Sequence, residues 1–198
     1  KTISIPTSHP DAIAIYNNFA SVDYTRVTKD AIMGEDVFLW SSPLKNSAAA
    51  SLAIATIDLH MSILDHLYQA VECDNDGQAV TGWDIHWDKA VASAVGWTEG
   101  TEDGGSSVNG YLFFQVAQEL CTHFGNCESD GQAIINKKLM AEFKNGQEKL
   151  KNNHCADAKL SLEAIERYLQ AILVDSLAFW SADGSKEEKN CLLAYVAR

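Results

Sequence analysis

Proline is scarce in this sequence. Three prolines occur among 198 residues, and all of them lie in the first quarter of the chain. Proline breaks a helix because it lacks the backbone N–H and its ring clashes with the preceding turn, so nothing after Lys45 forbids long helices. Strict alternation of apolar and polar residues over the length of a strand is also missing beyond the first few positions. We therefore expect an all-α fold.

Long apolar runs and basic charge are scarce as well. The most apolar stretch, residues 47–73, is interrupted by Asp58, His60 and Asp65, whereas a membrane span needs about 18 to 20 predominantly apolar residues. We predict no transmembrane segment. Lys and Arg number 15 against 27 Asp and Glu, which gives a net charge of −12. Such a field repels phosphate backbones, so we do not expect a nucleic-acid partner.

Sequence signatures of catalysis are absent too. The chain has no Gly-x-Ser-x-Gly elbow, phosphate-binding loop, dinucleotide fingerprint or His-Glu-x-x-His zinc motif. We therefore expect a protein that is not an enzyme. No internal repeat or low-complexity tract is apparent. We expect a single helical domain over residues 1–198, on its own or as one domain of a longer secreted protein.

Caps and apolar periodicity divide the chain into helices. Short connections favour antiparallel packing, so we expect an antiparallel helical bundle of about six to seven helices. A Gly-rich loop, "TEGTEDGGSSVNG", separates the third helix from the fourth, and long loops in compact domains are often functional. The predicted helices cover 11–22, 47–72, 84–97, 107 or 109 to 124, 131–152, 155–180 and a short 186–197.

Five cysteines are many for a cytosolic protein of this size, and none forms a Cys-x-x-Cys pair. We therefore expect disulfides and an oxidising compartment, which means a secreted, periplasmic or cell-surface location. Cys121 and Cys127 flank a helix end and a turn in "CTHFGNC", a spacing that allows their sulfurs to meet. The odd cysteine is either free or paired outside the chain.

The third predicted helix places polar groups among apolar residues. Asp84 and Asp88 lie in its first turns, where acids complement the helix dipole, which is a sufficient structural reason for both. His60 and His66 flank apolar residues of the preceding helix and fit hydrogen-bonded boundary positions better than ligand positions. Glu99 follows the helix, where neither a cap nor a solvated face explains it. Carboxylates and imidazoles on adjacent helices are also a common source of iron or zinc ligands.

The stretch "HWDKAVASAVGWTEGTEDGGSSVNGYLFFQVAQELCTHFGNC" (86–127) resembles the hallmark segment of the algal iron-assimilation proteins. These are low-iron-inducible periplasmic proteins, related to the phytotransferrin-like proteins of marine phytoplankton. The similarity extends to about residue 180. The residues that carry it are His86, Trp87, Asp88, Gly96, Glu99, Gly100, Gly104, Gly105, Tyr111, Leu112, Cys121, Phe124 and Cys127.

The resemblance implies an extracytoplasmic, non-catalytic protein that binds ferric iron for assimilation, and carbonate is the candidate synergistic anion. The ligands that we expect for the ion are His86, Asp88 and Glu99, with His60 and Tyr111 as further candidates. The chain departs from the family in "VASAVG", where small residues replace an aromatic, and at Trp97. These departures keep a second hypothesis open, an extracellular structural or interaction module on the same scaffold that binds a cell-surface protein and no metal.

Overall fold

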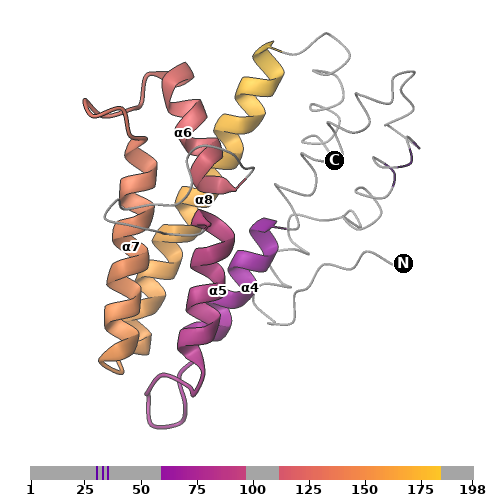
Figure 1. Cartoon of the computed structure of the whole chain (residues 1–198). Helices are drawn as coiled ribbons and strands as arrows, with labels where there is room; N and C mark the ends of the chain where they lie inside the picture. Colours follow the sequence, from indigo (N-terminus) through magenta and orange to yellow (C-terminus); the bar gives the residue numbers. More distant parts are fainter. Residues whose placement is uncertain (1–29, 31–32, 34, 36–58, 97–111, 184–198) are drawn as a thin grey trace.

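The computed structural model describes Asp30, Met33, Glu35 and the residues 59–96 and 112–183 (Figure 1). Within these residues the regular structure is entirely helical, which confirms the all-α fold class. The described part holds five helices rather than six to seven, and the first and last predicted helices lie outside it. The five are α4 (Leu59–Ala70), α5 (Trp83–Val95), α6 (Phe113–Phe124), α7 (Ile134–Lys151) and α8 (Cys155–Asp183).

Two of the predicted helix starts are wrong by several residues. The fourth helix begins at Phe113 rather than at 107 or 109, because Leu112 before it has an extended backbone with φ −75° and ψ 157°. The fifth begins at Ile134 rather than at Gly131, because Gly131 takes φ 84° and belongs to a turn. The predicted start of the second helix, at residue 47, lies outside the described residues, and the remaining boundaries agree with the prediction to within three residues.

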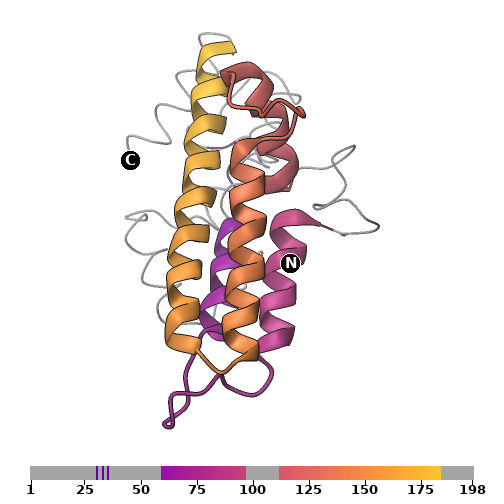
Figure 2. The same ribbon diagram turned by 90° about the vertical axis from the view of Figure 1, so that its left-hand side faces the viewer.

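Four helices form a bundle of two antiparallel hairpins. Helix α4 packs most closely on α5, and α7 packs most closely on α8. Both hairpins have their connections at the same end of the bundle (Figures 1 and 2). Helix α6 lies at the opposite end and packs on the C-terminal half of α8, where the rings of His123 and Phe179 are 4.4 Å apart. No described helix has both the length and the apolar character that a membrane span requires.

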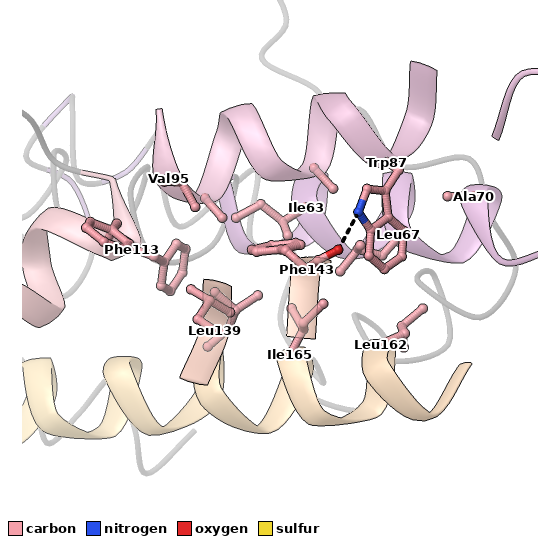
Figure 3. Packing of buried hydrophobic residues seen from close by; sticks show 14 of the residues in the cluster. Ile63, Leu67, Ala70, Trp87, Val95, Phe113, Leu139, Phe143, Leu162 and Ile165 are labelled. Atoms are coloured by element: carbon pink, nitrogen blue, oxygen red, sulfur yellow. Dashed lines mark hydrogen bonds between the residues drawn. The ribbon is translucent and has the colours of Figure 1, made fainter. Parts of the chain in front are cut away.

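The centre of the core is Trp87 of α5, which is completely buried. Its indole N–H donates to the carbonyl oxygen of Phe143 at 3.1 Å, and the two rings meet edge to face with centroids 6.1 Å apart. Figure 3 shows Trp87 reaching into the buried cluster beside Leu67, with its hydrogen bond to Phe143 dashed. Burial of an aromatic ring with its polar atom satisfied is a strong stabilising contact, so this side chain joins the two hairpins.

Gly146 allows α7 to approach this ring. A Cβ atom at position 146 would lie 2.3 Å from Cη2 of Trp87, which is far inside van der Waals contact. Glycine inside a helix costs up to about 1 kcal/mol relative to alanine. Here that cost is offset because the indole fills the space that a side chain would occupy.

Two disulfides fix the described helices. Cys73, in the connection between α4 and α5, bonds to Cys155 at the start of α8, across 82 residues of sequence. Cys121 near the end of α6 bonds to Cys127, six residues later, as the spacing had indicated. The first bond therefore ties the connections of the two hairpins together, and the second only closes a helix end.

The expectation that the sequence contains no internal repeat is wrong. The stretch "CDNDGQAV" (73–80) recurs as "CESDGQAI" (127–134), with the same spacing to the preceding helices α4 and α6. Each copy closes on itself through one antiparallel bridge, between Cys73 and Ala79 in the first and between Cys127 and Ala133 in the second. The flanking helices have diverged in sequence, so periodicity alone does not reveal the repeat.

The backbone hydrogen bonds of the two turns correspond one to one. In the first turn the N–H of Asp74 donates to the carbonyl oxygen of Gln78 at 2.8 Å, and in the second the N–H of Glu128 donates to that of Gln132 at 2.8 Å. The glycine that follows the shared aspartate has a positive φ in both copies, a conformation that strongly favours glycine. The described chain therefore contains two copies of a helix–turn–helix unit.

Candidate metal centre

His86 lies on the side of α5 that faces α4. Its ring is half-buried, and its Nδ1 is fully buried with no hydrogen-bond partner among the described residues. The register of the α4–α5 hairpin places His66 opposite it, with ring centroids 5.7 Å apart and the ring planes inclined by 45°. The Nδ1 of His66 is also buried and finds no partner in the same part of the chain. Two imidazoles from different helices therefore meet, each with one unsatisfied nitrogen.

The charges around His66 favour its neutral form. Burial lowers the pKa of His66, and the positive charges of Lys89 and His86 lower it further, while the carboxylate of Asp65 acts in the opposite direction. Asp65 itself is buried and accepts a hydrogen bond from the side chain of Gln69 at 2.6 Å. A neutral imidazole is the form that binds metal ions, so His66 is ready to act as a ligand near neutral pH.

His60 lies apart from this pair. It precedes His66 by six residues on α4, or about 9 Å along the helix axis, and its ring is 5.9 Å from that of Phe113. The side chain is 5% exposed, and its Nε2 has no hydrogen-bond partner within the described ranges. Burial lowers the pKa of His60 to about 4. His60 is therefore a neutral core residue rather than the hydrogen-bonded boundary residue that we expected.

Asp88 is exposed on the far side of α5. It follows His86 by two residues, which turns its side chain by about 200° around the helix. Glu99 and Tyr111 lie outside the described residues. Within the described ranges 59–96 and 112–183, no three His, Cys, Asp or Glu side chains come together as a metal-binding group. The five-residue ligand set therefore stays a prediction, and the observed cluster in this region is the pair His66 and His86.

A separate groove of about 350 Å³ lies between the end of α4 and the start of α8, beside the Cys73–Cys155 disulfide. Tyr68, Glu72 and Glu163 contribute to its walls. Nearby, burial and the charge of Glu163 raise the pKa of Glu166, while a hydrogen bond from Tyr68 opposes this shift. Tyr68 follows His66 by two residues, so the groove is on the opposite side of α4 from the imidazole pair.

Sequence reasoning missed His66 as the partner of His86. The signal was present, because His66 and His86 are equidistant in sequence from Asp76 in the middle of the connecting turn. In an antiparallel hairpin, residues equidistant from the turn lie at the same height. Recognising the repeated turn would have centred the hairpin on Asp76 and paired the two histidines.

Comparisons with known proteins give no family for this chain. No protein-family model matches it, and no match is found among curated proteins or solved structures.

Proposed function

We propose that this protein is a non-catalytic, extracytoplasmic metal-binding protein that serves iron assimilation. His86 is the central ligand of the proposed site, and Glu99 and Tyr111 of the following segment are the first candidates to complete it. The other predicted ligands, Asp88 on the far side of α5 and His60 further along α4, would have to reach the ion from outside this face of α5. The two disulfides are compatible with a secreted protein, since such bonds persist in oxidising compartments.

The observation that carries the proposal is the Nδ1 of His86, which is left unsatisfied by the described residues. A buried polar atom without a partner costs about 1 to 3 kcal/mol, and most buried polar groups in proteins are hydrogen-bonded or hold water or an ion. A bound metal ion would satisfy this nitrogen. Ferric iron is a hard cation that accepts imidazole nitrogen together with carboxylate and phenolate oxygen, which are the donors of the predicted set.

The test is a titration of the purified, disulfide-bonded chain with ferric iron, supplied as a weak chelate and with carbonate present. We expect uptake near one equivalent and its loss in Glu99→Ala. Asp88→Asn tests the second carboxylate, and Asp84→Asn is its matched control, since Asp84 is an exposed acid one turn earlier on the same helix. Absence of iron uptake by the wild-type chain would reject the proposal.

A second candidate function is an extracellular structural or interaction module that binds no metal. It is favoured by two large apolar side chains that α8 exposes, Leu160 and Val174, which would contribute to a protein contact. A chain that keeps its fold, takes up no metal and binds a cell-surface protein would support this function over the first.

A further inference from the structure

His66 and His86 share one feature, a buried Nδ1 that has no partner in the described part of the chain, on rings that face each other. A neutral imidazole has one donor and one acceptor nitrogen, and each normally finds a partner when buried. Two unsatisfied Nδ1 atoms on neighbouring rings point to a common cause.

The hairpin holds the two rings in fixed positions. The small buried residues Ala90 and Ala94 let α5 lie close to α4. The turn between the helices is closed by its own hydrogen bonds and tied to α8 through Cys73. Ligands held by rigid elements lose little conformational entropy when an ion binds, so the site is organised in advance.

The separation of the rings suits a shared ion. A metal–imidazole bond is about 2.0 to 2.1 Å long, so two imidazoles on one ion hold their ring centres roughly 5 to 6 Å apart. The observed centroid distance is 5.7 Å. Both rings are half-buried rather than fully enclosed, which leaves room for water to complete the coordination.

We propose that His66 and His86 bind one borderline transition-metal ion, of the class of Zn²⁺, Cu²⁺ or Ni²⁺, through their Nδ1 atoms. Imidazole is the preferred donor of this class, whereas carboxylate and carbonyl oxygens suit harder ions. The inference goes beyond the proposed function, because it adds a second imidazole from α4 and a metal class other than ferric iron. It does not require the carboxylates of the iron proposal.

The experiment titrates the full oxidised chain with Zn²⁺ and with Cu²⁺ by calorimetry, in the variants His66→Gln, His86→Gln and the double variant. His154→Gln is the matched control, since His154 is exposed. We expect one equivalent bound by the wild type and by the control. Each single variant should bind at least roughly 10- to 100-fold more weakly, the loss that even an outer-shell change causes. The double variant should be little worse than either single variant.

Electron paramagnetic resonance of the Cu²⁺ form provides a readout that does not depend on affinity. Nitrogen couplings should indicate two coordinated imidazoles in the wild type and one in each single variant. Circular dichroism checks that the variants are folded. Unchanged binding in a folded His66→Gln variant, or no binding by the wild type, overturns the inference.

Measuring ferric-iron uptake in Glu99→Ala beside Zn²⁺ binding in His66→Gln distinguishes the iron site from the imidazole pair. Loss of iron uptake in Glu99→Ala, with Zn²⁺ binding unaffected by His66→Gln, would support the iron site and reject the imidazole pair. Loss of Zn²⁺ binding in His66→Gln, from a chain that takes up no ferric iron, would support the pair and reject iron.

Discussion

The two helix–turn–helix units of this protein share one turn but differ in what surrounds it. Both turns use the same backbone hydrogen bonds, the same bridge and a glycine with positive φ. In the first unit the cysteine of the turn bonds to α8, and α4 and α5 pack along their lengths. In the second unit the cysteine bonds to its own helix, and α6 turns away from α7 towards the end of α8.

This difference shows that the turn and the helix packing are decided separately. The eight-residue turn is local and repeats wherever its sequence repeats. The closeness of the flanking helices depends on their apolar faces and on where the disulfide leads. The first unit therefore gained a tight interface in which two histidines can face each other, while its copy has Leu120 and Met140 at the positions of His66 and His86.

Removal of the disulfides should cause the largest loss of stability. In the chain-entropy model, closing the 82-residue loop stabilises the fold by about 4 to 5 kcal/mol, and closing the six-residue loop by about 2 kcal/mol. We expect the double variant Cys73→Ser/Cys155→Ser to lose about twice the unfolding free energy lost by Cys121→Ser/Cys127→Ser. Urea denaturation monitored by circular dichroism measures both. Equal losses would mean that the two units contribute alike.

The second-largest effect should be the dependence of stability on pH that His60 gives the first unit. His60 has its pKa lowered from 6.5 to about 4, so the unfolded chain binds this proton more tightly than the folded chain. The contribution of His60 to the unfolding free energy is therefore fully present above about pH 6.5. It falls by about 3 kcal/mol as the pH drops towards 4. The equivalent position of the second unit is Phe114, which is buried. We expect His60→Phe to abolish this component, measured as the difference in unfolding free energy between about pH 7 and about pH 4.5.

A matched change at the exposed His154 serves as the control for this measurement. His154→Phe should leave the wild-type difference between the two pH values unchanged. If His60→Phe keeps the full loss of stability at low pH, then other groups, and not His60, cause it.

Substitution of either turn glycine by alanine should lower the stability of the fold by a similar amount, and by less than the changes above. Gly77 has φ 75° and Gly131 has φ 84°, and a side chain in left-handed backbone costs about 1 to 2 kcal/mol. No atom of the described chain lies within 4 Å of the place that a Cβ would take at either position, so conformational strain is the main cost. Thermal unfolding of Gly77→Ala and Gly131→Ala should give similar losses. A loss in one variant alone would contradict the equivalence of the turns.

The smallest effect concerns an ion-pair cluster of the second turn. Lys137 contacts Glu128 at 2.7 Å and Asp130 at 2.6 Å, and the first unit has Trp83 at the position of the lysine. The hydrogen bond from Lys137 lowers the pKa of Asp130. We expect Lys137→Met to raise the pKa of Asp130 towards its ordinary value while stability hardly changes, because both partners are exposed. An NMR titration of the Asp130 carboxyl group measures this pKa.

The helices could be predicted because their causes are local. Apolar spacing and the lack of proline located all five described helices, and the six-residue spacing of Cys121 and Cys127 indicated their bond. The bond between Cys73 and Cys155 could not be foreseen, since its partners meet only after two hairpins have packed. His66 was overlooked for the same reason, because its facing partner depends on the register between α4 and α5.

The sequence by itself determined the helical class, the repeated turn and the acidic charge, since backbone preferences and composition act within a few residues. Only the tertiary structure decided that Trp87 lies on Gly146, that His60 is buried and that His66 faces His86. These outcomes depend on which helical faces pack together, and packing is a property of pairs of segments that no single stretch of sequence contains.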